Sequence, residues 1–345
     1  MPFEEIVISY YLKEFWTAQS RQLHAHSSSF LEQNVAQSST RILCGEQANT
    51  IQIFALAHYL LFCAFRRQIV HSPPKAPQMP SHVQNNNDPV LIFTMKWGGL
   101  YGPHYVNNLA RGVKKHLKRP HRFICFTDDP KGLDNGVEAM PLPELGLPEG
   151  HNDTRWQKLA LFRKDLMGLK GTALFLDLDL VVVDDLEPLF EIDGAFRIIR
   201  DDDLFRSKPL RKVNPSRDAF LHSVGNSSVF RYEVGAHSYI LDTFVADPDT
   251  VTNKFEISQQ FQSDQLATHA HLSYWPKEWC VSFKNHCVPR GFSSYFAAPS
   301  LPEGARIVVF AGSPKMDDAL NGKGSKWYRR IGDVSWLKSQ WMNAS

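Results

Sequence analysis

From residue 90 onward, short apolar runs alternate with segments of helical periodicity, and this order restricts the fold more than any other feature. The predicted strands are residues 90–95, 122–127, 137–142 and 172–176. The predicted helices are residues 103–117 and 154–167. In the first of these helices, apolar residues from Val106 to Leu117 recur on one face, as in a helix that covers a sheet. Such an order predicts an α/β fold with a mostly parallel central sheet and helices on both faces.

Beyond residue 190 the signals are less regular. Strands are predicted at residues 194–200, 227–232 and 306–310, and helices at residues 235–245 and 263–269. The sequence contains no internal repeat. We therefore expect one α/β domain over residues 89–335, long enough to bury a sizeable core.

The first 88 residues differ in texture and are predicted to form a poorly structured or helical N-terminal extension. Residues 72–89 are rich in Pro and Asn and are expected to be a linker. Residues 51–65 are mostly apolar, but this run is shorter than the roughly 20 residues of a membrane helix and contains Gln52 and His58. A docked helix and a peripheral membrane association are both left open for this segment.

The composition places the chain among ordinary globular proteins, with 43% hydrophobic and 21% charged residues. A formal net charge of +2 provides no global field for nucleic acid, so no nucleic-acid partner is expected. The five cysteines show no CxxC motif and no metal-type spacing. Cys280 and Cys287 could pair in an oxidising compartment, but so sparse and odd a set favours a reducing one, and we expect a cytoplasmic protein.

Two carboxylates interrupt the fourth apolar run, in the stretch TALFLDLDLVVVDDLEPLF at residues 172–190. In extended chain Asp177 and Asp179 point to the same side, and Leu178 points to the other. Burying such charges without a partner is costly, whereas Mg²⁺ and Mn²⁺ prefer oxygen ligands and share their remaining positions with phosphates. The pair therefore suggests a divalent cation that binds a diphosphate. Two solvated carboxylates at a strand end are the alternative, because a bare Asp-x-Asp often arises by chance.

Polar residues also follow the first two predicted strands. Thr94 and Lys96 lie at the end of the first, and Asp128 and Asp129 follow the second. Because the carboxyl ends of parallel strands meet at one edge of the sheet, these residues and Asp177 are expected to converge on one ligand site.

The letters around Asp177 also fit the motif of haloacid dehalogenase-type phosphatases, in which the first Asp is a nucleophile and the second an acid or base. That motif continues with Gly-Thr, whereas this chain has Leu180 and Val181. It also usually opens its domain, whereas several strand and helix signals precede it here. The phosphatase is therefore the weaker of the enzyme alternatives.

A set of motifs in order, from about residue 90 to about residue 320, resembles a GT-A-fold glycosyltransferase related to the family 8 group of galactosyltransferase and glycogenin-like enzymes. The motifs are MKWGGLYGPHYVNNLARGVKKHL, RFICFTDDPKGL, RWQKLALF, LFLDLDLVVVDDLEPLF, NSSVFRY, SDQ and VVFAGSPK. The resemblance implies a nucleotide-sugar donor such as a UDP-sugar, a divalent cation (Mn²⁺ or Mg²⁺), and a glycan or other hydroxyl acceptor. It also implies that the anomeric configuration is retained and that the protein acts in polysaccharide biosynthesis.

The resemblance also implies roles for individual residues. It assigns Asp177 and Asp179 to the metal, Thr94, Lys96, Tyr101 and Asp128 to the nucleoside, and Lys158 and Lys315 to the phosphates. It assigns Asn226, Asp264 and Gln265 to catalysis near the transferred sugar, with Ser227 beside them. A turn or helix-cap role for Asp128 and Asp129, and a solvated helix position for Lys158, are left open.

One departure from the family pattern concerns the metal. The family supplies a third ligand, a His, in the late loop where this chain reads Val309-Phe310-Ala311-Gly312. Two carboxylates with diphosphate oxygens can hold a cation, only more weakly. A catalytically degenerate module that binds a nucleotide or glycan without turnover is therefore the alternative to an active enzyme.

Overall fold

The computed structural model describes residues 89–147, 154–204, 219, 222–289, 293, 296–324 and 331–341. The predicted N-terminal extension, including the apolar segment at residues 51–65 and the linker that follows it, lies outside the described residues. Within the part that is described, no helix is long and apolar enough to cross a membrane.

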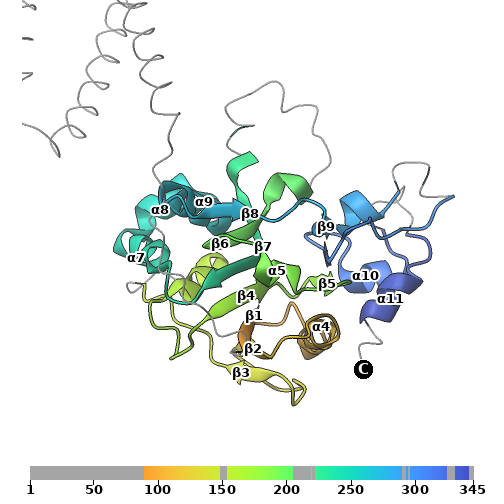
Figure 1. Ribbon diagram of the computed structural model, residues 1–345, viewed down its shortest axis with the longest axis horizontal. Helices are drawn as coiled ribbons and strands as arrows, with labels where there is room; N and C mark the ends of the chain where they lie inside the picture. Colours follow the sequence, from red (N-terminus) through yellow and green to blue (C-terminus); the bar gives the residue numbers. More distant parts are fainter. Residues whose placement is uncertain are drawn as a thin grey trace, which may run out of the picture. The chain divides into compact units, whose positions relative to one another are not determined.

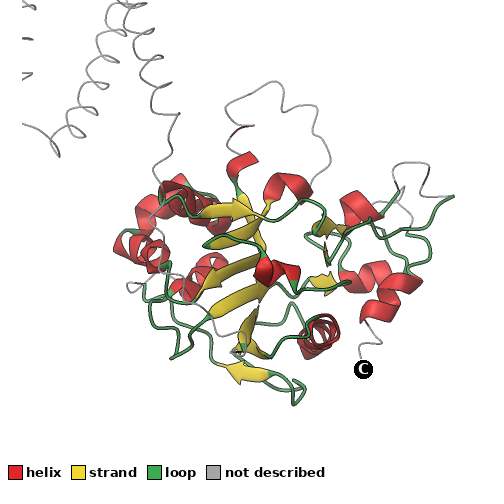
Figure 2. Ribbon diagram, in the orientation of Figure 1, coloured by secondary structure: helices red, strands yellow, loops and turns green. Residues whose placement is uncertain are grey.

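A seven-stranded sheet with the order β3-β2-β1-β4-β7-β6-β8 forms the centre of the domain (Figure 2). Its strands are β1 (Val90–Lys96), β2 (His121–Thr127), β3 (Glu138–Met140), β4 (Thr172–Leu176), β6 (Phe196–Arg200), β7 (Gly225–Glu233) and β8 (Leu272–Tyr274). Only β7 runs antiparallel to its neighbours, β4 and β6, and the other paired strands are parallel. The predicted α/β class with a mostly parallel sheet is confirmed.

A second sheet of three short strands has the order β5-β10-β9, and the sequence did not predict it. Its strands are β5 (Leu180–Val182), β9 (Cys280–Ser282) and β10 (Ile307–Val309). The Val-rich run after Asp179 supplies β5, which pairs antiparallel with β10. The chain therefore passes from one sheet to the other through residues 177–179.

Helices cover both faces of the large sheet, as predicted (Figure 1). They are α4 (Pro103–His116), α5 (Pro188–Glu191), α7 (Ser238–Ala246), α8 (Pro248–Lys254), α9 (Ser258–Thr268), α10 (Met316–Leu320) and α11 (Ser335–Trp341). Shorter or irregular turns are η1 (Thr154–Phe162), η2 (Asp201–Leu204) and η4 (Phe283–Cys287). One face packs against α4, α10, α11 and the small sheet, and the other packs against η1, α7, α8 and α9.

Strand β1 shows how the sequence divides between these two cores. Val90 and Ile92 enter the core beneath α4, whereas Leu91 and Phe93 enter the opposite one, and all four are at most 3% exposed. A strand buried on both faces reads as a continuous apolar run, which is why β1 was recognisable from sequence. Cys125 on β2 is equally buried, and burial raises the pKa of its thiol to about 12.

The segment at residues 154–167 differs from its prediction. An α-helix was expected, but the chain forms a 3-10 helix that ends at Phe162. Asp165 Oδ1 accepts a hydrogen bond from the backbone N–H of Gly168 (2.8 Å), and Leu166 bridges to Leu169. This tight turn leads the chain into β4 and leaves no room for further helix. The apolar residues predicted to face inward, Leu159, Phe162 and Leu166, are nevertheless fully buried.

Candidate active site

The Asp177-Leu178-Asp179 segment lies at the junction of the two sheets. Strand β4 ends at Leu176, and the Asp177 backbone N–H still donates to Ser228 O of β7 (2.9 Å). Two residues later, Asp179 O accepts from the backbone N–H of Phe310, which follows β10 (2.8 Å). Main-chain bonds to a different sheet therefore fix each end of the segment, and the two carboxylates are held in place by the fold.

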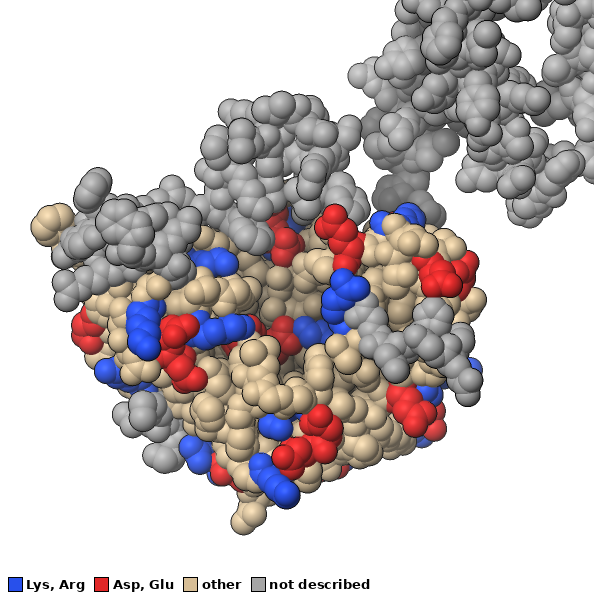
Figure 3. Space-filling view, turned by 180° about the vertical axis from the view of Figure 1, so that it is seen from behind, with Lys and Arg blue, Asp and Glu red and all other residues tan. Residues whose placement is uncertain are grey.

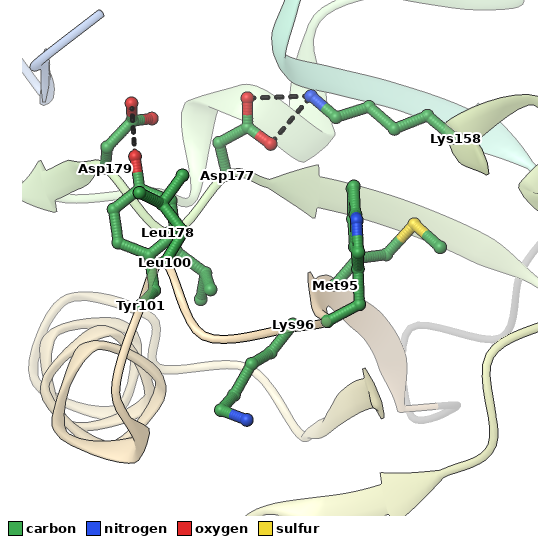
Figure 4. A pocket seen from close by; sticks show the side chains of 9 residues that line it. Met95, Lys96, Leu100, Tyr101, Lys158, Asp177, Leu178 and Asp179 are labelled. Atoms are coloured by element: carbon green, nitrogen blue, oxygen red, sulfur yellow. Dashed lines mark hydrogen bonds and ion pairs between the residues drawn. The ribbon is translucent and has the colours of Figure 1, made fainter. Parts of the chain in front are cut away.

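Asp177 is ion-paired with Lys158 of η1. The Lys158 ammonium lies 2.7 Å from both carboxylate oxygens of Asp177 (Figure 4). It also donates to Ser227 O (3.3 Å) and lies 5.1 Å from the centre of the Phe175 ring. Burial and the neighbouring Asp179 charge raise the pKa of the Asp177 carboxyl, while Lys158 acts in the opposite direction. Lys158 is thus a partner of the acidic pair and not a solvated helix lysine.

Asp179 is held by residues that lie far away in the sequence. Tyr101 Oη donates to Asp179 Oδ2 (3.1 Å), and the Lys315 ammonium lies 3.5 Å from the same oxygen. Lys315 also donates to Tyr101 Oη at 2.6 Å. Burial and the Asp179 charge raise the pKa of Tyr101, so its hydroxyl stays protonated and can donate. The glycine turn after β1 and the late loop before α10 therefore meet at this carboxylate.

The turn after β1 is fixed by Asp128. Gly98 adopts a left-handed conformation, with φ +62°, which a residue with a side chain rarely takes. Its backbone N–H donates to Asp128 Oδ2 (2.9 Å), while Asp129 Oδ1 accepts from the N–H of Lys131 (3.1 Å). Both aspartates thus make turn contacts in the structure, and a contact of Asp128 with a nucleoside stays a prediction.

A cavity of about 270 Å³ opens beside the acidic pair (Figure 4). Its lining residues are Met95, Lys96, Trp97, Leu100, Tyr101, Lys158, Asp177, Leu178 and Asp179. The size is close to the lower end of the ~300–1,000 Å³ range of small-molecule sites. Trp97 and Leu100 were not predicted as site residues, and Leu100 is 75% exposed on the glycine turn. The signal that could have found them is the presence of two large apolar residues within a Gly-rich turn at a strand end.

Two predicted nucleoside residues on β1 lie differently from the rest of the site. Thr94 is fully buried and does not line the cavity, and within the described part of the chain its hydroxyl has no hydrogen-bond partner. Lys96 lines the cavity with its stem, but its ammonium turns away from the acidic pair (Figure 4) and lies 3.4 Å from Asp129 O. Their contact with a nucleoside stays a prediction.

Asn226 belongs to a polar group at the start of β7. Its amide donates to Asp201 Oδ1 (3.0 Å), and its side-chain oxygen accepts from the N–H of Ser228 (3.1 Å). Gln259 of α9 also donates to Asp201 Oδ1 (3.4 Å) and accepts from the N–H of Ser227 at the same distance. Because Ser227 O accepts a hydrogen bond from the Lys158 ammonium, which is paired with Asp177, this polar group lies next to the acidic pair. Asp201 and Gln259 were missed, since nothing in their local sequence marks them.

Asp264 and Gln265 do not line the cavity beside the acidic pair, and no hydrogen bond or ion pair described above connects them to it. Asp264 lies 3.8 Å from the Lys254 ammonium of α8, and Gln265 donates to Asp264 at 3.4 Å. The bonds from α9 to β7 come from Gln259 and Ser263 instead. A catalytic role for Asp264 and Gln265 stays a prediction.

A lysine stands beside the position where the third metal ligand was expected. Lys284 of η4 donates to the carbonyl oxygen of Ala311 (2.8 Å), and Ala311 follows Phe310, the residue bonded to Asp179. Among the described residues, no group of three or more His, Cys, Asp or Glu side chains could hold a metal ion. The described neighbourhood of the pair thus carries ammonium groups where the family pattern has a His.

Charged side chains of both signs are interspersed over the face seen in Figure 3. Near the middle of this face, acidic and basic groups lie close together in a hollow (Figure 3). This face therefore shows no extended patch of a single sign.

No family model matches this chain, and no curated protein matches it either. Among solved structures, the chain is similar to the galactosyltransferase LgtC in complex with donor and acceptor sugar analogues, at 12% identity and a TM-score of 0.45, over 66% of this chain and 88% of that chain. An active-site mutant of LgtC is similar at 13% identity and a TM-score of 0.43, over 69% and 91%.

The apo structure of the bifunctional glycosyltransferase WbbM is similar at 12% identity and a TM-score of 0.43, over 68% of this chain and 47% of that chain. All of these proteins are glycosyltransferases, the class that the sequence motifs resemble. Identities and TM-scores this low transfer no function to this chain, which has to be inferred from the site itself.

Proposed function

We propose that this protein is a glycosyltransferase that moves a sugar from a nucleotide-sugar donor, such as a UDP-sugar, to a hydroxyl group of a glycan or other acceptor. The observation that carries the proposal is the position of the cavity. Strand order runs from β1 to β2 and β3 on one side, whereas β4 lies on the other side of β1. Open α/β sheets bind nucleotides at such a switch point, outside the carboxyl ends of the strands.

The side chains at this switch point suit a diphosphate. Lys158 and Lys315 place ammonium groups beside the cavity wall, on Asp177 and Asp179 respectively. Preorganised positive charge of this kind stabilises the charge that develops on a departing nucleoside diphosphate. Trp97 and Leu100 add apolar surface at the same opening, which fits a base or ribose.

The proposed transfer retains the anomeric configuration, with the acceptor hydroxyl attacking on the side of the leaving group. We assign no protein nucleophile. The leaving phosphate itself accepts the proton of the acceptor hydroxyl in this proposal. Asp264 would steady the oxocarbenium-like charge in the family pattern, but its contacts with α8 do not support that role, so we base no step on it.

The predicted divalent cation, Mn²⁺ or Mg²⁺ on Asp177 and Asp179, is the part of the mechanism that the site supports least. Both carboxylates are already engaged, one by Lys158 and the other by Tyr101 and Lys315. The late loop offers Ala311 and no imidazole. This donor set does not fit a resident ion, and no step of the proposed mechanism passes through one. Metal dependence stays a prediction.

A screen of nucleotide sugars tests the proposal. The full chain is incubated with UDP-, GDP- and ADP-sugars, with Mn²⁺, with Mg²⁺ and with EDTA, and release of the nucleoside diphosphate is measured. We expect slow hydrolysis of one donor class, and much slower release in a Lys315→Gln variant, which lacks an ammonium group proposed to contact the diphosphate. Nucleotide binding without any turnover would indicate the binding module instead, and no binding or turnover at all would refute the proposal.

No specific observation favours the phosphatase alternative. The residue after Asp179 is Leu180, the first residue of β5, so the tight turn of that motif is absent from this junction. Release of phosphate from p-nitrophenyl phosphate by this chain would support the phosphatase alternative. The cytoplasmic location and the peripheral membrane contact also stay predictions.

A further inference from the structure

We infer that Lys158 and Lys315 take the place of the divalent cation, so that the diphosphate of the donor binds to this chain without a metal. The inference rests on the proposed function, because it concerns how the same site would hold a nucleotide diphosphate. It departs from the family pattern, in which a metal ion bridges the Asp pair and the donor.

The position of Lys158 is the first reason. Its ammonium lies 2.7 Å from each oxygen of Asp177, which is where a cation shared between these oxygens would have to bind. Ser227 O at 3.3 Å and the Phe175 ring at 5.1 Å fix the same group from two further directions. The side chain is only 19% exposed. Lys158 is therefore a built part of the site, and its charge is directed at the cavity wall.

Lys315 makes the matching arrangement on the second carboxylate. Its ammonium contacts Asp179 Oδ2 (3.5 Å) and Tyr101 Oη (2.6 Å), and it lies 5.1 Å from the centre of the Tyr101 ring. Asp179 is 16% exposed and Lys315 is 36% exposed. The ammonium thus remains open to a ligand on one side, while tyrosine and aspartate hold it on the other.

The charge balance is the second reason. Lys158 and Lys315 bring two positive charges to the two carboxylates, so each carboxylate already has a cationic partner. A divalent ion would add two positive charges beside these ammonium groups and would compete with them for the same oxygens. The negative charges of a nucleotide-sugar diphosphate would instead meet the ammonium group of Lys158, which lines the cavity, and that of Lys315 beside it.

Calorimetric titration of the full chain with UDP tests the inference. We expect dissociation constants in EDTA and in excess Mn²⁺ that agree within about threefold. Binding that is lost in EDTA and restored by Mn²⁺ would overturn the inference and leave the proposed function intact. No UDP binding in either buffer would refute the proposed function itself, and the inference with it.

Substitutions further distinguish diphosphate binding by the two lysines from diphosphate binding through a divalent metal. Lys315→Gln should weaken UDP binding in EDTA by about tenfold or more, since a charge-assisted hydrogen bond is lost. Lys338→Gln, at an exposed position on α11, is the matched control and should bind as the parent does. An unchanged affinity in Lys315→Gln would contradict the inference.

Asp177→Asn gives opposite signs in the two accounts. If Asp177 is a metal ligand, the variant loses UDP binding. If Lys158 is the cation, the variant frees its ammonium for phosphate, and UDP binding should tighten by about threefold or more. The double variant Lys158→Gln/Asp177→Asn removes both charges of the ion pair. It is used in place of Lys158→Gln alone, which would leave the Asp177 carboxylate without its partner and destabilise the fold. It should bind UDP more weakly than Asp177→Asn does, and equal binding would overturn the inference.

Discussion

The buried imidazole of His237 predicts a marked loss of stability in mild acid. His237, at the start of α7, is 1% exposed. Its Nε2 lies 3.3 Å from Ala195 O and its Nδ1 lies 3.1 Å from Tyr239 Oη, which also lies 3.2 Å from His271 Nδ1. Since a carbonyl only accepts, Nε2 carries the hydrogen, and Nδ1 accepts from the tyrosine hydroxyl. The neutral ring is thus fully bonded, and a second proton, on Nδ1, would disrupt the bond from the tyrosine hydroxyl and place a charge in a buried site.

The size of the effect follows from the pKa. Burial, with a smaller contribution from His271 and His269, lowers the pKa of His237 from 6.5 to about 4. Between these values the unfolded chain binds more protons than the folded chain, so the free energy of unfolding rises with pH. The stabilisation is complete above pH ~6.5 and is lost as the pH falls towards ~4. A pKa difference of about 2.5 corresponds to roughly 3 kcal/mol.

Urea unfolding followed by circular dichroism at pH 7.5, 5.5 and 4.5 measures this effect. The parent chain should lose about 2–3 kcal/mol more across this range than His237→Gln, which cannot take up the proton. His104→Gln, at a position with a 57% exposed side chain, is the control and should keep the acid dependence of the parent. If His237→Gln and the parent lose stability in parallel, the buried neutral imidazole is not the cause and the reasoning is wrong.

Three further predictions concern the scaffold. Asp128→Ala removes the acceptor of the Gly98 N–H and should cost about 1 kcal/mol of stability while weakening UDP binding severalfold, measured by urea unfolding and calorimetry; an unchanged affinity would mean that this turn does not shape the cavity. Arg231→Met removes the guanidinium that donates to the carbonyls of Leu189 and Gly194, each at 2.8 Å. We expect the free energy of unfolding in urea to fall by about 2–4 kcal/mol, and a fall below about 0.5 kcal/mol would contradict this prediction. Phe230→Ala opens a cavity between the stacked rings of the core and should cost about 3–5 kcal/mol, which a Phe230→Leu control should largely recover; equal losses in both would contradict the packing account.

The fold was predictable where burial on both faces leaves an uninterrupted apolar run. Strand β1 and its neighbours show this pattern. For α4, the proline at its first position predicts where the helix starts, and the spacing of its apolar residues predicts which face is buried. Strand β5 was not predictable, because three residues of Leu and Val next to an acidic pair do not reveal a partner more than 120 residues away at β10. The 3-10 helix before β4 was also missed, since its end depends on the Asp165 turn.

Some members of the candidate site were predictable from sequence, but the contacts between them were not. Asp177, Asp179, Tyr101, Lys158 and Lys315 do come together, as the motifs suggested. That a lysine would bond to each carboxylate depends on contacts between distant segments, which local sequence does not encode.

Other members of the site region depend on packing in the same way. Lys284 reaches Ala311 only because β9 pairs with β10. Asp264 has an ion-pair partner only because α8 precedes α9 at close range. Neither contact can be read from the residues that flank it.

A crystal structure of the chain with UDP tests the central claim most directly. We expect the diphosphate at the carboxyl ends of β1 and β4, with phosphate oxygens within about 3 Å of the ammonium groups of Lys158 and Lys315. The nucleoside should lie against the glycine turn at Trp97. A diphosphate bound elsewhere on the chain, or a cavity that stays empty at saturating UDP, would contradict the account.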